Sequence, residues 1–427
     1  MKTEKKLTVM ENMVWNTVGS FTYLICQWLL TFILVRCFDD VDGAGQLSLA
    51  MSITNIFYTL AHFNVRSYLI SDIQGNFKIP EYSAFRLLTC GFSITACYIY
   101  ISCFGYNREQ FFCILFYMIF RLGEAWVDLL HGMEQRRSRM DIGGLSLFVR
   151  GILLIVSFVT VFYFTDNFNL SILAMAVSTW SYILLADVSF AKKFEDFRPA
   201  FSWEKMKSMM GIFLLVTTAS FLGLIASNFP RQILESRMGS EILGIYSTVA
   251  TPAVIVQVAA TYVFNPVLTE FAVLYNHKDS KDRFTKFVLK IIGILVALSV
   301  VCLVGAAALG EWGLNLLYGQ RIAEHAYLFM PVICYTCLNA FVWFLWNLLI
   351  VIRRLKSLLV VNSIGLVICF LLIHPMITVF SMNGVSYTLI IYSVVVISLM
   401  LGVLLFDLKS KGRNYKTEKE MSREGKI

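Results

Sequence analysis

The most regular feature of the chain is a series of apolar runs of about 20 residues, separated by short polar links. The hydrocarbon core of a bilayer is about 30 Å thick, and a helix rises about 1.5 Å per residue. A run of about 20 apolar residues is therefore long enough to cross it. The pattern predicts spanning helices at 13–36, 46–65, 84–103, 110–130, 142–164, 169–190, 209–229, 243–266, 287–309, 325–351, 357–380 and 384–406.

The long polar link at 191–208 divides these runs into two equal sets. We therefore expect two six-helix lobes, 1–200 and 201–408, followed by a basic tail at 409–427. A short internal echo supports two similar halves, because the pattern acid-x-x-Gly-x-x-Ser occurs at Asp42–Ser48 and again at Glu241–Ser247. Each copy enters the second span of its half. Parallel repeats of this kind are typical of transporters with a substrate site between two lobes.

Composition agrees with this pattern. Hydrophobic residues make up 58% of the chain and charged residues 15%, whereas soluble domains are about 25% charged. The predicted fold class is therefore an all-α, polytopic membrane protein with about twelve helices in two lobes. A nucleic-acid partner is not expected, because the Lys and Arg are distributed among the links and do not gather on one soluble face.

The distribution of positive charge predicts the orientation. With the N-terminus inside, 29 of the 36 Lys and Arg lie in inner segments and five in outer ones. Arg121 and Arg150 lie within spans. Positive residues concentrate on the cytoplasmic side of membrane proteins. Both termini are therefore expected to be cytoplasmic.

No motif for a chemical reaction occurs in the chain. There is no phosphate-binding G-x-x-x-x-G-K-[ST] and no zinc-binding H-E-x-x-H, and the five His are scattered. We therefore expect no catalytic residue, metal or cofactor, and a protein that is not an enzyme. The outer links are short, which argues against a membrane polysaccharide polymerase, since such an enzyme usually needs a larger loop to hold its acceptor.

The fourth expected span carries an unusual set of charges. Arg121, Glu124 and Asp128 lie at i, i+3 and i+7, on one helical face. Arg150 lies in the fifth span at a depth similar to that of Glu124, about 10 Å from the inner surface. We expect Glu124 and Arg150 to pair. A structural ion pair is favoured over a substrate or coupling role, because pairing is how membranes tolerate such groups.

A second set of polar residues follows three other spans. Gln27 lies in the first span, Asn55 and His62 in the second, and Asn228 in the seventh. Arg66 ends the second span, and Pro230 closes the seventh just before Arg231. Two readings stay open: amides can hold helices together and cations at helix ends can reach the interface, or these side chains face a cavity and an anionic ligand.

Several stretches resemble the polysaccharide-exporter branch of the multidrug/oligosaccharidyl-lipid/polysaccharide flippase superfamily, which contains the O-antigen and capsule-repeat flippases. The resemblance covers most of the chain, in the expected order and with the expected number of spans. The residues that carry it are Gly43–Ala50, Asn64–Asp72, Arg86, Gly132, Gln135, Arg139–Asp141, Asn228–Gln232, Leu243–Ser247 and Asn265–Pro266.

This resemblance implies a transporter of the bacterial inner membrane, with no ATPase of its own. It would move a polyprenyl-pyrophosphate-linked oligosaccharide between leaflets by alternating access around a cationic cavity. Arg66 and Arg231 become candidates for the pyrophosphate, which suits the forked guanidinium. Gln27, Asn55, His62 and Asn228 become candidates for sugar or water. The implied partners are the lipid-linked oligosaccharide, membrane lipids and other membrane proteins of lipopolysaccharide or capsule assembly.

Two rival functions stay open at this stage. The first is an ion-coupled drug or cation antiporter of the same superfamily, in which Glu124 or Asp128 would serve as the acid. The second is a membrane-embedded polysaccharide polymerase. A major-facilitator carrier would also have two six-helix halves, but its Gly-x-x-x-Asp-Arg loop is absent, since Ser71–Gly75 stands in that place.

Overall fold

The structure of the chain is a computed structural model. Part of the eighth expected span and the Asn265-Pro266 pair lie outside the residues that the structure describes. The described residues are 8–38, 40–71, 77–137, 139–194, 196–254, 256–257, 260, 271 and 281–423.

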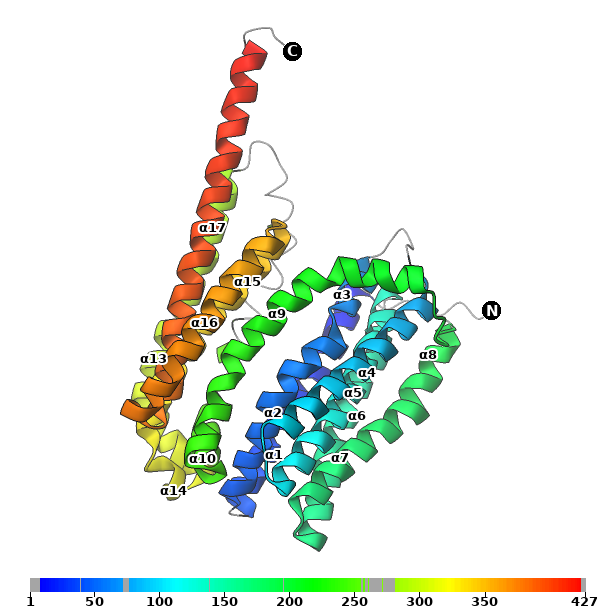
Figure 1. Cartoon of the computed structure of the whole chain (residues 1–427), viewed down its shortest axis with the longest axis vertical. Coiled ribbons are helices and arrows are strands. Elements are labelled where there is room, and N and C mark those ends of the chain that lie inside the picture. The colour runs from blue at the N-terminus through cyan, green and yellow to red at the C-terminus, as the bar shows by residue number, and fades with distance from the viewer. Residues whose placement is uncertain are drawn as a thin grey trace. The chain divides into compact units, whose positions relative to one another are not determined.

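The described residues form helices and no strands (Figure 1). The first half of the chain contains α1 (Val9–Cys37), α2 (Val41–His62), α3 (Val65–Ser71), α4 (Ile79–Cys103), α5 (Arg108–Arg136), α6 (Met140–Thr165), α7 (Phe168–Tyr182), the π-helical turn η1 (Ile183–Asp187) and α8 (Val188–Phe194). The second half contains α9 (Trp203–Met238), α10 (Ser240–Ala250), η2 (Thr251–Ala253), α13 (Lys281–Tyr318), α14 (Gln320–Ala323), η4 (Ala326–Leu328), α15 (Phe329–Val351), α16 (Leu355–Phe380) and α17 (Asn383–Arg423).

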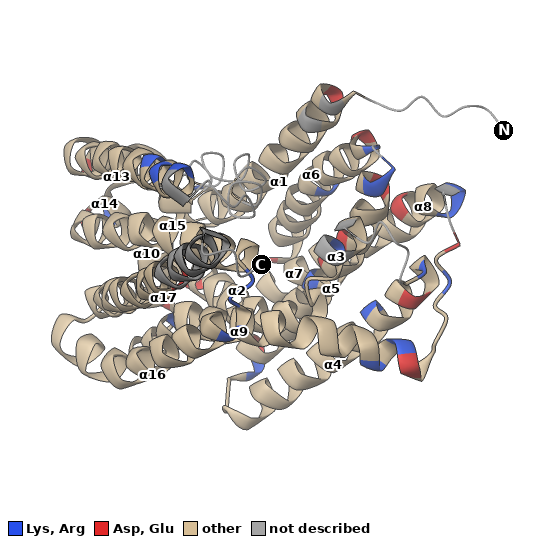
Figure 2. Cartoon of the chain, turned by 90° about the horizontal axis from the view of Figure 1, so that it is seen from above, with Lys and Arg blue, Asp and Glu red and all other residues tan. Residues whose placement is uncertain are grey.

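The chain is a multi-pass membrane protein. Nine helices in the described ranges are long and apolar enough to cross a bilayer. The expected spans outside these nine are those in α2 and α5, which carry polar side chains, and 243–266, which is described only in part. Figure 2 shows charged residues near the ends of α4, α6 and α8, with few along the helices. The predicted all-helical class is confirmed.

Short polar residues begin several of these helices. Asn107 accepts a hydrogen bond from the backbone N–H of Gln110 at 2.8 Å, and the Gln110 side chain accepts one from the Asn107 backbone at 3.3 Å. Asp40 accepts one from the N–H of Gly43 at 2.7 Å. The first N–H groups of a helix have no partner within it, so such caps fix where it starts.

The chain forms two compact units. Unit 1 comprises 1–224 and 235–244, and unit 2 comprises 225–234 and 245–427. In unit 1, α5 packs against α2, α4, α6 and α7 (Figure 1), so its polar face lies inside the unit. In unit 2, α17 packs against α15 and α16. The lobes expected at 1–200 and 201–408 stay a prediction.

The expectation that Pro230 closes the seventh span is wrong, because α9 continues through Pro230 to Met238. A proline lacks the N–H that would bond to the carbonyl four residues earlier. In α9 that carbonyl belongs to Ala226, and it accepts a hydrogen bond from Cys369 Sγ of α16 at 3.2 Å. A neighbouring helix thus satisfies the freed carbonyl, and the helix continues.

Candidate functional site

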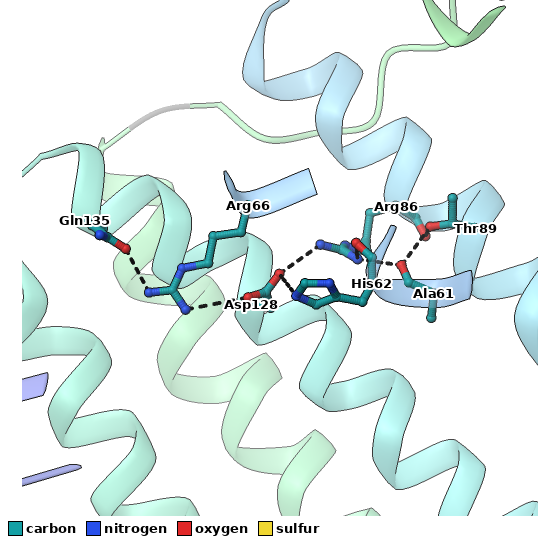
Figure 3. Close-up of polar contacts among 7 residues, drawn as sticks. All are labelled: Ala61, His62, Arg66, Arg86, Thr89, Asp128 and Gln135. Carbon is teal, nitrogen blue, oxygen red and sulfur yellow. Dashed lines mark hydrogen bonds and ion pairs between the residues drawn. The ribbon is translucent and has the colours of Figure 1, made fainter. Parts of the chain in front are cut away.

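Asp128, on the face of α5 toward α2, is surrounded by three basic side chains (Figure 3). Its carboxylate lies 3.1 Å from His62 Nε2, 3.1 Å from Arg86 Nη2 and 3.5 Å from Arg66 Nη1. These four residues come from α2, α3, α4 and α5, and we call them the Asp128 cluster. All four belong to unit 1.

The end of α2 determines this arrangement. Phe63 and Asn64 both adopt positive φ angles, of 47° and 54°, which stop the helix at His62. The chain then starts α3 at Val65. Arg66 therefore lies on a short helix of its own, whereas the sequence pattern placed it at the end of the second span.

Arg86 is fully buried and caps the end of α2. Its Nη1 donates hydrogen bonds to the carbonyls of Ala61 and His62, the latter at 2.7 Å. Thr89 Oγ1 adds a second donor to Ala61, at 3.0 Å. The last carbonyls of a helix have no partner within it. Arg86 therefore stabilises the helix end and balances Asp128 at the same time.

The cluster carries more positive than negative charge. Arg66 and Arg86 are permanent cations, and Asp128 is the single carboxylate among the four residues. The Arg86 side chain is inaccessible, whereas the Arg66 side chain is 27% exposed. Arg66 Nη2 also donates to Gln135 Oε1 at 2.8 Å. Arg66 is thus the cation of the cluster that a ligand can reach.

A second polar cluster lies about one helical turn earlier on α5, at Glu124. Arg150 on α6 forms a hydrogen-bonded ion pair with Glu124. Its Nε donates to Ser146 Oγ at 3.1 Å, and Ser146 Oγ donates to Asp187 at 3.0 Å. Asp187 ends the π-helical turn η1. The structure thus places Glu124 and Arg150 in contact and adds Asp187, which sequence reasoning missed.

Arg121 forms no ion pair with either cluster among the described residues, and it contacts an aromatic ring next to the Asp128 cluster. Its guanidinium carbon stands 3.9 Å from the centre of the Tyr58 ring, a cation–π contact. The same ring packs against His62, with the two ring centres 5.6 Å apart. Arg121 Nε has no hydrogen-bond partner among the described residues. The expected network of Arg121, Glu124, Asp128 and Arg150 is therefore divided among different partners.

The other candidates contribute separately. Asn228 and Arg231 lie on α9 in unit 2, and Arg231 Nε has no hydrogen-bond partner in the described ranges. Gln27 on α1 and Asn55 on α2 are half-buried. Within the described residues, no hydrogen bond or ion pair joins either amide to the Asp128 cluster.

Arg86 and Gln135 are members of the site that sequence reasoning used only for the resemblance. Arg86 lies three residues into the third expected span, where a buried cation signals a specific partner. The signal for Asp187 was an acid within the sixth expected span, 169–190. Its partner could not be found from helical periodicity, because the π turn changes the register.

Solved structures of known fold match this architecture along nearly the whole chain. An inward-facing multidrug resistance MATE family transporter of the MOP superfamily matches with a TM-score of 0.65 and 12% identity, over 91% of this chain and 99% of the other. The MATE transporter VcmN of Vibrio cholerae matches with a TM-score of 0.61 and 8% identity, over 94% and 97%. The chain therefore has the fold of the MATE transporters of the MOP superfamily.

The sequence is similar to those of proteins of polysaccharide biosynthesis. A family model described as "Polysaccharide biosynthesis protein" matches residues 188–326. The capsular polysaccharide biosynthesis protein CapF of Staphylococcus aureus is 23% identical over 321 residues, which cover 74% of this chain and 79% of CapF. Together with the MATE-like fold, these matches confirm the resemblance to the polysaccharide branch of this superfamily that the sequence motifs predicted.

Proposed function

We propose that this protein is a flippase that moves a polyprenyl-pyrophosphate-linked oligosaccharide across the bacterial inner membrane by alternating access. The MOP fold and the likeness to polysaccharide biosynthesis proteins support the transporter class and the glycan substrate. The observation that carries the proposal is the excess positive charge of the Asp128 cluster, in which Arg66 is the accessible guanidinium and Arg86 the buried one.

The chemistry of the headgroup fits this cluster. A pyrophosphate is a dense anion that hydrocarbon rejects, and a guanidinium can hold two of its oxygens at once. Arg66 now donates to Gln135 and pairs with Asp128. When Arg66 turns to the headgroup, Asp128 keeps Arg86 and His62 as partners, so its charge stays compensated. The exchange therefore leaves no buried carboxylate without a partner.

Arg231 is proposed as a second pyrophosphate ligand. No carboxylate within the described residues lies in ion-pair distance of this side chain, and its Nε lacks a hydrogen-bond partner. A cation without an acidic partner is ready to bind an anion. Asn228, three residues earlier on α9, and Gln27, Asn55 and His62 are proposed contacts to sugar or water.

The remaining expectations complete this proposal. Both termini are cytoplasmic, transport uses neither an ATPase nor a cofactor of the chain, and no covalent bond of the substrate changes. Membrane lipids and other membrane proteins of polysaccharide assembly are the expected partners. The cation antiporter is disfavoured, because Asp128 is surrounded by basic groups and Glu124 is paired with Arg150. Neither acid is therefore available to a cationic drug.

The test is glycan complementation in a flippase-null strain, with the amount of inserted protein measured in parallel. Arg66→Ala and Arg231→Ala are expected to insert normally and to restore less than about a tenth of the glycan. A tenfold loss corresponds to the loss of one charge-assisted contact of about 1.4 kcal/mol. Lys should substitute poorly, since an ammonium lacks the planar fork. Arg108→Ala, an exposed change on α5, is the control. Full restoration by both Ala variants would contradict the proposal.

A further inference from the structure

Glu134, near the end of α5 that is expected to be cytoplasmic, is a buried acid without a partner. Glu134 is 1% exposed, and neither of its carboxylate oxygens has a hydrogen-bond partner within the described residues. The other acids of this interior all have one: Glu124 has Arg150, Asp128 has three basic neighbours, and Asp187 has Ser146. Among these acids, Glu134 therefore lacks the donor that would stabilise its ionised form.

The space around Glu134 is shaped by a glycine. A Cβ atom on Gly143 of α6 would lie 3.0 Å from Glu134 Oε2 and 3.2 Å from His131 Cδ2. His131 precedes Glu134 by three residues, so both lie on one face of α5. His131 is 7% exposed, and its Nε2 also lacks a hydrogen-bond partner among the described residues. Two unpartnered titratable groups therefore meet at one glycine.

The charges that face this place do not compensate an ionised Glu134. The titratable and charged groups that surround Glu134 and its neighbour His131 are Arg66 of α3, Asp128 of α5, Asp141 and Arg150 of α6, Tyr182 of α7 and Asp187 of η1. Both cations already have carboxylate partners, Arg66 in Asp128 and Arg150 in Glu124. An isolated carboxylate is costly in a low-dielectric interior, and Asp187 and Asp141 add repulsion. Both effects favour the protonated acid.

We propose that Glu134 and His131 form a proton-binding site at the inner end of unit 1. In the proposed resting state the Glu134 carboxyl group carries the proton. A water molecule that enters from the cytoplasm would accept this proton: the Oε–H bond breaks, an O–H bond to the water forms, and a carboxylate and a hydronium ion remain.

The site is linked to the substrate site through Arg66. A Cβ atom on Gly132 of α5 would lie 3.2 Å from Arg66 Cγ, so the stem of Arg66 packs on α5 at Gly132, the residue after His131. A pyrophosphate on Arg66 would neutralise the positive field that Glu134 experiences from that side. Substrate binding would then favour protonation, and protonation would favour substrate binding to the same degree. This link rests on the proposed function, whereas the proton site itself does not.

The first test is an infrared pH titration of the purified full-length protein in lipid nanodiscs. The wild type should show a carbonyl band of a buried carboxylic acid that disappears as the pH rises. Glu134→Gln should remove this band, and Glu109→Gln, an exposed change on the same helix, should keep it. His131→Gln should shift its midpoint. A band that Glu134→Gln does not affect, or one that never titrates, would overturn the proposal.

The second test separates the proton site from the proposed function. Proton uptake is measured in weakly buffered nanodiscs on addition of polyprenyl pyrophosphate, with polyprenyl alcohol as the control. The pH is set to the midpoint of the infrared titration, where half of the Glu134 carboxyl groups are ionised. The wild type should take up protons when polyprenyl pyrophosphate is added and not when polyprenyl alcohol is added. Glu134→Gln should lose this uptake. If the infrared band titrates but the pyrophosphate neither binds nor causes uptake, the site stands and the flippase function fails. If the pyrophosphate binds without uptake in the wild type, the link through Arg66 is wrong.

Discussion

At the scale of single residues, the interior of unit 1 shows how buried charges are stabilised in a membrane protein. Each of Glu124, Asp128 and Asp187 touches a donor from a different helix. Such pairs add little net stability compared with apolar residues, but removing one partner leaves an uncompensated charge, which costs about 3–5 kcal/mol. The contacts therefore determine which helices pack together more than how stable the protein is.

We expect a double-mutant cycle to show this for Glu124 and Arg150. Glu124→Gln and Arg150→Gln should each destabilise the protein by about 3 kcal/mol, and the double variant should recover at least about 1 kcal/mol of that loss. The matched control is the pair Arg139 and Asp141, which is closer to solvent and separated by 3.0 Å. Its coupling should stay below about 1 kcal/mol. Unfolding in detergent measures the single and double variants of both pairs, and additive effects at Glu124 and Arg150 would show that they act independently.

These contacts also show how far a sequence determines a site. Glu124 and Arg150 could be paired in advance, because regular helical geometry gives both their face and their depth. The partners of Arg86 could not, since they are carbonyls that exist only where α2 stops. That end depends on positive φ angles at Phe63 and Asn64, and phenylalanine rarely adopts them. Asp187 was hidden for a similar reason, because a π turn places it.

At the scale of elements, the repeated acid-x-x-Gly-x-x-Ser pattern corresponds to a close helix crossing. Gly45 of α2 and Gly244 of α10 occupy the same place in the two copies, and the helices cross at these two residues. A Cβ atom on Gly45 would lie 1.8 Å from the Ser240 carbonyl oxygen, and one on Gly244 would lie 2.0 Å from that of Val41. Gln110 of α5 fixes the crossing through hydrogen bonds to Glu235 and, at 3.4 Å, to Ser240.

We therefore predict that Gly45→Ala and Gly244→Ala both lower the melting temperature and the amount of folded protein, because backbone must move to admit either methyl group. Gly91→Ala and Gly211→Ala are the controls, since a Cβ atom there would meet no atom within 4 Å. In a helix these changes should be neutral or stabilising by up to about 1 kcal/mol. Thermal unfolding in detergent separates the two groups, and equal behaviour of all four variants would disprove the close crossing.

At the scale of the whole molecule, the positive residues predict how the chain is inserted. Reporter fusions after Arg137 and Asp196 should be active only on the cytoplasmic side, and those after Asp166 and Ser381 only on the outer side. This orientation is predicted because 29 Lys and Arg lie in inner segments and five in outer segments. The reverse result for either pair would contradict an orientation with both termini inside.

The helical class and the near-complete set of spans were predictable at this scale, since apolar length and the bilayer thickness determine them. The ends of the helices were less so: α9 passes the proline that was expected to end it, because Cys369 satisfies the freed carbonyl. Substrate chemistry is the part that neither pattern nor fold determines. The MOP fold is shared with multidrug transporters, so the proposed flippase function depends on the polysaccharide relatives and on the charge of the Asp128 cluster.

The most direct measurement is therefore flipping by the purified protein. Vesicles would contain the protein and a polyprenyl-pyrophosphate-linked oligosaccharide on one leaflet, and a lectin that cannot cross the membrane would report arrival on the other. We expect the wild type and Arg108→Ala to flip the lipid, and Arg66→Ala to lose at least about nine-tenths of the rate, the effect of one lost contact of about 1.4 kcal/mol. A wild type no faster than protein-free vesicles, or an Arg66→Ala variant as fast as the wild type, would contradict the account.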